Sequence, residues 1–249
     1  MSVPAGIEAA AHRYLSRITS KFHSIWMEPK SLPILAGPLP SSVDLRSKLL
    51  PVKDQGQEGD CTGQGTSCLV EYNTNSPEWL SAPYLYAKGR QAEGTFPADS
   101  GCVIGDVVSS ANADGCCLNS LLPQDGDPAE CPTAADDADA ATRKIGSPMG
   151  VNFSDDGTEC RANLAAGKLV VIGFTVYPSF ESTGSDGIVS ADLSGDPLGG
   201  HCVVVCGYDD SLNGGSWIIR NSWGTGWAAG GYCFMPYGQL ALWSEAWTA

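Results

Sequence analysis

The chain has 249 residues, of which 43% are hydrophobic and 17% charged, a composition typical of globular rather than disordered proteins. The formal net charge of −14 argues against nucleic acid as a partner and against adhesion to anionic membranes. No apolar run approaches the roughly 18 residues of a membrane span. The N-terminus shows no secretory signal, which slightly favours a cytoplasmic location and leaves the localisation open.

The first predicted element is an amphipathic helix over residues 7–26, where apolar residues recur at helical spacing with basic residues between them. Residues 31–40 contain three prolines and are expected to run extended. Residues 1–38 carry four basic and two acidic side chains, a net charge of +2, so the rest of the chain carries −16. This N-terminal segment therefore differs in charge from the body that follows it.

Three further helices are predicted before residue 116. The first begins at Cys61 and is weak, because Gly63 and Gly65 each cost a helix interior about 1 kcal/mol relative to alanine. The second lies within 81–94, where a serine and an early proline form a helix-start signal. The third lies within 99–116, where valines recur at helical spacing.

The character of the sequence changes after about residue 146. An Ala/Asp-rich stretch, 132–142, is expected to be a loop or a short helix. Runs rich in β-branched and aromatic residues then predict strands at 168–177, 201–210, 215–223 and 230–236. Helices first and strands second indicate an α+β fold, with a helical lobe at 39–145 and a β-rich lobe at 146–249.

The ten cysteines do not repeat as C-x-x-C pairs. A structural zinc site is therefore not expected, and no other cofactor is predicted. Spacing alone does not give disulfide connectivity, and five cysteines are candidates for bridges: Cys116, Cys117, Cys131, Cys160 and Cys233.

One cysteine has the surroundings of a nucleophile. Cys61 stands at a predicted helix N-terminus, where unpaired N–H groups and the helix dipole favour a thiolate. A nucleophile also needs a base, and the base needs an orienting group. His201 is the only histidine outside the N-terminal segment, and Asn221 follows at the end of a later predicted strand. His201 lies 140 residues after Cys61, and Asn221 lies 20 residues after His201.

This order and spacing match the papain-type cysteine peptidases. The chain resembles the papain (C1) family in the stretches VKDQG…C, GGHxxxxxGYD and NSWGxxWxxxGY, in that order, and the resemblance covers roughly residues 39–240. It is most similar to the branch without a long pro-region. The resemblance implies a papain-like fold, with a helical lobe, an antiparallel β-barrel-like lobe and an active-site cleft between them.

The resemblance also implies roles for individual residues. Cys61 is the nucleophile, His201 the acid and base, Asn221 its orienting partner and Gln55 an oxyanion donor. Trp223 shields the His–Asn hydrogen bond from solvent, and the open backbone of Gly101 pairs with an extended substrate. Ser100 and Gly200 are further substrate-binding or supporting positions. Peptides or proteins are the implied substrates, and residues 1–38 are either a packed helix or a short self-inhibitory segment.

The chain departs from the family pattern close to the nucleophile. Glu58 replaces the usual cysteine three residues before Cys61, so the corresponding disulfide cannot form, and Thr62 replaces a bulky aromatic residue. These changes leave the substrate preference open. Two other functions are considered: a papain-like domain retained as a binding module, and a related thiol amidase. The complete set of catalytic residues argues against the first, and Gln55 with NSWG argues against the second.

Overall fold

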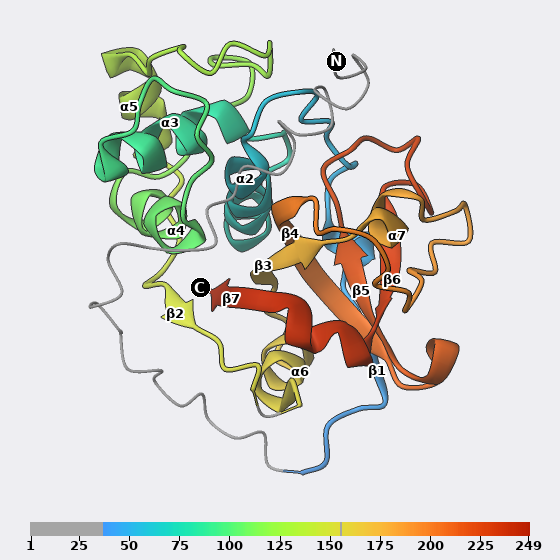
Figure 1. Ribbon diagram of the computed structural model, residues 1–249. Helices are drawn as coiled ribbons and strands as arrows, with labels where there is room; N and C mark the ends of the chain where they lie inside the picture. The colour runs from blue at the N-terminus through green and yellow to red at the C-terminus, as the bar shows by residue number, and fades with distance from the viewer. Residues whose placement is uncertain (1–36, 155) are drawn as a thin grey trace, which may run out of the picture.

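The computed structural model describes residues 37–154 and 156–249. The predicted helix at 7–26 and most of the predicted extended segment lie outside these residues. Within them, most of the helices gather on one side of the molecule, and the strands lie on the other side together with two short helices (Figure 1). No helix in the described part of the chain is long and apolar enough to cross a bilayer.

The helical side contains α2 (Cys61–Thr74), α3 (Ala82–Glu93), α4 (Ile104–Ala113) and α5 (Ala134–Ala140). Two of these begin at caps that the sequence announces. Ser81 accepts a hydrogen bond from the Tyr84 N–H at the start of α3, and Thr133 and Asp136 form a reciprocal capping box at α5. The three predicted helices are confirmed, and 132–142 contains a short helix.

Helix α2 stands between helices α3 and α4 and the sheet (Figure 1). Every residue from Cys61 to Glu71 is buried, which explains why this helix lacks a clear polar stripe. Its glycines are places of close approach. A Cβ on Gly63 would lie 2.3 Å from the Ala82 carbonyl oxygen, and one on Gly65 would lie 2.9 Å from Cys202 Sγ.

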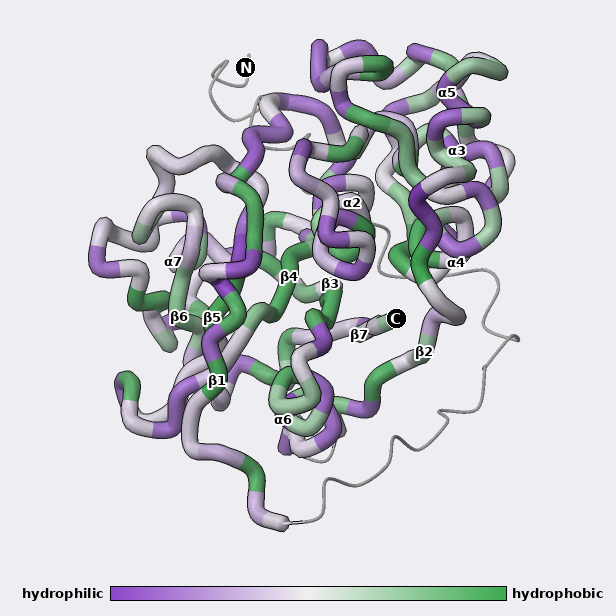
Figure 2. The backbone as a smooth tube through the Cα atoms, turned by 180° about the vertical axis from the view of Figure 1, so that it is seen from behind, coloured by the Kyte–Doolittle hydropathy of each residue, from purple (hydrophilic) through white to green (hydrophobic). Residues whose placement is uncertain are grey.

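The strands form one seven-stranded sheet with the order β2-β7-β3-β4-β5-β6, in which β1 also pairs with β4. They are β1 (Ser42–Asp44), β2 (Met149–Gly150), β3 (Val170–Val176), β4 (Gly199–Asp209), β5 (Ser216–Arg220), β6 (Tyr232–Pro236) and β7 (Trp243–Thr248). All of the ladders are antiparallel. The apolar colouring of β3, β4 and β5 in Figure 2 marks the core that these strands share with α2.

Several elements were not predicted. They are β1, β2, β7, α6 (Thr158–Ala165) and α7 (Pro178–Glu181). Strand β1 lies within 39–145, which the sequence assigns to the helical lobe, yet it pairs with β4. The division at about residue 146 is therefore not a strict division in space.

All ten cysteines lie in the described residues, and none of them forms a disulfide. Nine are buried and Cys131 is exposed. The five cysteines considered as bridge candidates therefore form no disulfide. Four of the five are buried in the core, as thiols commonly are, and Cys131 lies at the surface.

Candidate active site

The site forms where the N-terminus of α2 meets strand β4. Cys61 is the first residue of α2, and its thiol is fully buried. Burial raises the pKa of the Cys61 thiol to about 12, while hydrogen bonds from the backbone N–H groups of Cys202 and Thr62 lower it. Because Cys202 directly follows His201 in β4, the sulfur lies beside the histidine-bearing strand.

His201 is oriented by Asn221. The two side chains are joined by a 2.8 Å hydrogen bond between His201 Nε2 and Asn221 Oδ1. Strand β4 carries His201, and Asn221 directly follows β5, its antiparallel neighbour in the sheet. The Asn221 oxygen also accepts the Ser222 N–H at 2.8 Å. Asn221 is therefore fixed in the orientation that presents its oxygen to the His201 ring.

An aromatic cluster covers the His–Asn pair. Trp223 stacks on the His201 ring with centroids 4.9 Å apart and planes inclined by 27°. Phe180 and Trp227 pack edge-on against Trp223 at 5.5 and 5.1 Å. These rings exclude water from the hydrogen bond, and a hydrogen bond in apolar surroundings is electrostatically stronger than one in water. The sequence motif predicts the shielding role of Trp223. The packing of Phe180 against Trp223 could not be predicted, because only the fold brings these two rings together.

Gln55 is buried and held at both ends of its side-chain amide. Its Oε1 accepts the Ser222 hydroxyl at 2.6 Å, and its Nε2 donates to the Glu58 carbonyl at 3.0 Å. The backbone N–H of Gln55 also donates to the Ser222 carbonyl at 2.9 Å. Ser222 thus ties Gln55 to the segment that carries Asn221. This serine was missed at the sequence level, although it stands inside the NSWG motif.

The supporting positions lie on both sides of this centre. Gly200 precedes His201 in β4 and pairs with Thr175 of β3. Gly101 has a φ of +68°, a conformation that favours glycine, and its N–H donates to the Tyr86 hydroxyl at 3.0 Å. Ser100 Oγ donates to the Gly101 carbonyl at 3.2 Å. Both the N–H and the carbonyl of Gly101 therefore have a hydrogen-bond partner inside the protein.

Carboxyl groups crowd the turn before the nucleophile. Burial, with the Asp99 charge second, raises the pKa of Glu58 to about 7. Burial, with the Glu58 charge second, also raises the pKa of Asp60. Amide side chains hold both groups: Gln124 donates to Glu58 at 2.7 Å, and Gln64 donates to Asp60 at 2.9 Å. Among the described residues, no cluster of three His, Cys, Asp or Glu side chains is arranged to hold a metal ion.

Comparison with known proteins identifies the family of this chain. The family model for papain family cysteine proteases matches residues 39–242. The chain belongs to the papain family of cysteine proteases. Within that family it is similar to cysteine proteinase 3 of Entamoeba histolytica, with 30% identity over 78% of this chain and 61% of the relative. It is also similar to an uncharacterized C1-like peptidase of Acanthamoeba polyphaga mimivirus, with 28% identity over 76% of this chain and 65% of the relative.

Solved structures of the family share the fold. Xylellain, a cysteine protease from Xylella fastidiosa, aligns with a TM-score of 0.80 and 26% identity over 96% of this chain and 95% of the other. Procathepsin L 3 of Tenebrio molitor aligns with a TM-score of 0.73 and 21% identity, over 97% of this chain and 77% of the other. The expected papain-like fold is therefore confirmed. This chain spans about three fifths of the length of the curated relatives named above.

Proposed function

We propose that this papain-family chain is a cysteine endopeptidase that cleaves peptide bonds through Cys61, His201 and Asn221. The observation that carries the proposal is the 2.8 Å hydrogen bond between His201 Nε2 and Asn221 Oδ1, stacked under Trp223 and placed beside the N-terminus of α2. Cys61 opens α2, His201 lies in β4 and Asn221 directly follows β5; the proposed roles follow the logic of a nucleophile, a base and an orienting group.

The reaction begins with an ion pair. A thiol buried as deeply as Cys61 stays neutral near neutral pH unless a cation lies beside it, because burial penalises the thiolate. Transfer of the thiol proton to His201 produces a thiolate and an imidazolium that stabilise each other. Asn221 keeps the ring in the orientation that this exchange needs, with Nε2 bound to its oxygen, and Nδ1 is the atom that takes up and delivers the proton.

The bond-making steps follow from this ion pair. The thiolate attacks the peptide carbonyl, and the resulting oxyanion is stabilised by the Gln55 amide and by the backbone N–H of Cys61, which as the first residue of α2 has no acceptor within its helix. The imidazolium then gives its proton to the leaving amine, and a thioester to Cys61 remains. His201 next removes a proton from water, which attacks the thioester. The bond between the carbonyl carbon and Cys61 Sγ then breaks, the carboxylic acid leaves, and the pair of Cys61 thiolate and His201 imidazolium is restored.

The most direct test is site-resolved alkylation with iodoacetamide at about pH 6, beside hydrolysis of a fluorogenic peptide. We expect Cys61 to be labelled faster than exposed Cys131, and the Cys61 labelling to be lost in His201→Ala. Cys61→Ala should abolish hydrolysis. Hydrolysis that survives in Cys61→Ala, or labelling spread evenly over the cysteines, would reject the mechanism.

We further propose that residues 1–38 form a short inhibitory segment. The support is electrostatic, because this segment carries +2 and the rest of the chain −16. Deleting residues 1–38 should raise turnover per titrated active site and speed inactivation by an active-site inhibitor. If neither rate changes, the segment has no inhibitory role.

A further inference from the structure

The turn before the nucleophile is fastened by a hydrogen-bonded carboxylate. In the family pattern a cysteine stands at the position of Glu58, and here no disulfide holds this turn. The Gly59 N–H instead donates to both carboxylate oxygens of Asp99, at 3.2 Å each. Gly59 lies two residues before Cys61, and Asp99 lies two residues before Gly101. This contact therefore joins the nucleophile turn to the loop on the proposed substrate side.

A buried tyrosine fixes the carboxylate. Tyr86 on α3 is fully buried, and its hydroxyl donates to Asp99 Oδ1 at 2.5 Å. The same hydroxyl accepts the Gly101 N–H at 3.0 Å. Burial and the Asp99 hydrogen bond raise the pKa of Tyr86, so the phenol keeps the proton that it donates. One phenol therefore sets both the position of Asp99 and the conformation of Gly101.

Arg90, one turn further along α3, holds the loop that carries Asp99. Its guanidinium lies 3.6 Å from the centre of the Tyr86 ring. It also donates to the Ala98 carbonyl at 2.9 Å and to the Pro128 carbonyl at 2.8 Å. Since Arg90 is almost completely buried, these contacts anchor the loop from inside the protein. Asp99 is thus presented to Gly59 from a rigid base.

We propose that Asp99, held by Tyr86, is a positioning residue that sets the nucleophile turn of Cys61 against the substrate-side loop at Gly101. It does by hydrogen bonding what a covalent bridge does in relatives with the cysteine. The inference rests on the proposed peptidase mechanism. It predicts that the contact matters mainly for the geometry of attack, because a small displacement of a reacting group lowers the rate steeply.

Charge and geometry make opposite predictions for this residue. The negative charge of Asp99 contributes, after burial and the Asp60 charge, to raising the pKa of Cys61. Removing that charge therefore favours the thiolate and moves the acidic limb of alkylation to lower pH. Removing the hydrogen bonds displaces the turn and lowers kcat. A variant that gains thiolate and loses turnover separates positioning from electrostatics.

The experiment compares Asp99→Ala, Asp99→Asn and Tyr86→Phe with Asp114→Ala, which removes an exposed carboxylate from the same side of the molecule. Rates of peptide hydrolysis are measured per titrated active site, and alkylation of Cys61 is measured against pH. We expect Asp99→Ala to lower kcat about tenfold or more, with the alkylation limb unchanged or at lower pH. Asp99→Asn should recover most of kcat, because its single amide oxygen can accept both the Gly59 N–H and the Tyr86 hydroxyl. Asp114→Ala should match the wild type.

An unchanged kcat in Asp99→Ala overturns the inference, as does a loss explained by a higher thiol pKa. If Asp99→Ala does not fold, Tyr86→Phe decides: a lower kcat supports positioning, and a wild-type kcat rejects it. The underlying mechanism fails separately. Activity retained by Cys61→Ala, or an inactive wild type, rejects the peptidase itself, whereas an inactive Cys61→Ala beside a fully active Asp99→Ala rejects only the role of Asp99.

Discussion

Buried carboxyl groups next to a nucleophile carry a cost that depends on pH. Glu58 is 3% exposed, and it lies three residues before the proposed nucleophile. Its charge has to be tolerated close to Asp60 and Asp99, and desolvation is the largest of the effects that raise its pKa. The Gln124 amide offsets this only in part. The turn is therefore most stable when the Glu58 carboxyl is protonated.

The stability of the protein should reflect this proton. The Glu58 carboxyl has a pKa of 4.5 without the fold and about 7 within it. Between these values the folded state binds more protons than the unfolded state, so the free energy of unfolding falls as the pH rises from about 4.5 to about 7. In Glu58→Gln this contribution is absent, and the decline should be smaller by on the order of 1–3 kcal/mol.

Urea denaturation at pH 5 and pH 8 measures this difference. Glu78→Gln is the matched control, because it changes an exposed glutamate to the same residue and should follow the wild type at both values. A decline in Glu58→Gln equal to that of the wild type would show that Glu58 is not protonated in the folded protein.

The sequence suggests the proposed catalytic residues because each stands in a short motif, and the order of the motifs is itself informative. Their supports could not be predicted in the same way. The Gln55–Ser222 hydrogen bond joins residues 167 positions apart, and the Gly59–Asp99 contact joins residues 40 positions apart. Nothing local in the sequence marks either pair. Cooperation between distant polar groups is decided by packing, which the motifs do not contain.

At the scale of elements, α2 is unusual because it is surrounded by protein. Gly63 meets the Ala82 carbonyl at the start of α3, and Gly65 meets Cys202 of β4. The helix is thereby pressed against both sides of the site at the end that carries Cys61. The weak helical propensity of this segment is the consequence of close packing, and tertiary contacts supply the stability that propensity does not.

Gly63→Ala tests this packing. Alanine gains about 1 kcal/mol of helix propensity, but its Cβ would lie 2.3 Å from the Ala82 carbonyl oxygen, so α2 and α3 must separate. We expect a net loss of about 2 kcal/mol or more in the free energy of unfolding, measured by denaturation. Gly238→Ala, where no atom lies within 4 Å of the added carbon, should be nearly neutral. Equal stabilities for the two variants would contradict the role given to Gly63.

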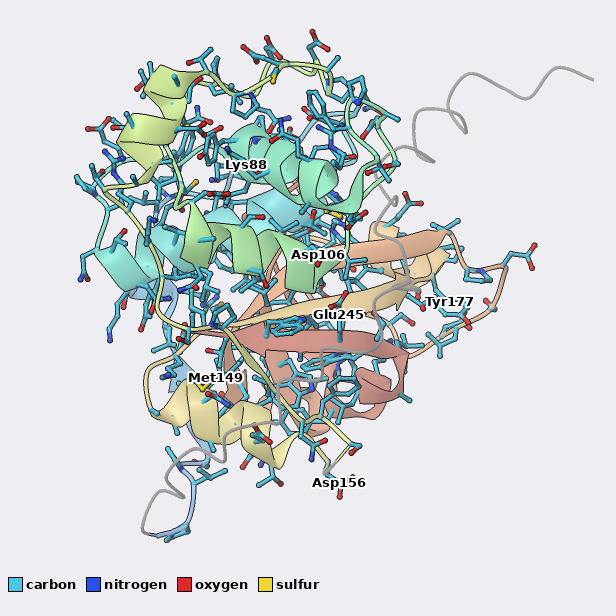
Figure 3. All side chains as sticks on the ribbon, turned by 90° about the vertical axis from the view of Figure 1, so that its left-hand side faces the viewer. Lys88, Asp106, Met149, Asp156, Tyr177 and Glu245 are labelled. Atoms are coloured by element: carbon cyan, nitrogen blue, oxygen red, sulfur yellow. The ribbon has the colours of Figure 1, made fainter. Side chains whose placement is uncertain are left out.

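Other elements show where sequence patterns were insufficient. Strand β7 follows directly after a 3₁₀ helix at Tyr237–Leu242, and its tryptophans do not alternate cleanly with polar residues. Its place in the fold comes from contacts with distant elements. Glu245 of β7 accepts the Ile104 N–H at the start of α4 at 3.3 Å, and Figure 3 shows Glu245 and Asp106 close together where this strand meets the helix. Strand β7 therefore caps the N-terminus of α4, which belongs to the helical side of the molecule.

At the scale of the whole molecule, the two sides are held together by polar contacts as well as by the core. Arg220 of β5 donates to the carbonyls of Leu50 and Pro51 at 2.6 and 2.7 Å, on the segment that leads to Gln55. Lys53, on the same segment, pairs with Glu71 of α2 at 2.8 Å. The approach to the nucleophile is thus fixed to strand and helix at once, which supports a rigid site rather than one assembled by closure.

The net charge of −14 predicts a preference for cationic peptide substrates. Asp99 lies two residues before Gly101 on the proposed substrate side, and Glu93 accepts the Val103 N–H close by at 2.6 Å. Acidic groups attract cationic peptides and repel anionic ones. For two fluorogenic peptides with the same core and either two lysines or two glutamates as flanks, kcat/KM should be several-fold higher for the lysine peptide at low salt. The ratio should approach one at about 1 M NaCl, where the Debye length falls to about 3 Å. A ratio that does not change with salt would assign the preference to direct contacts, and a ratio of one at low salt would show that the field does not reach the substrate.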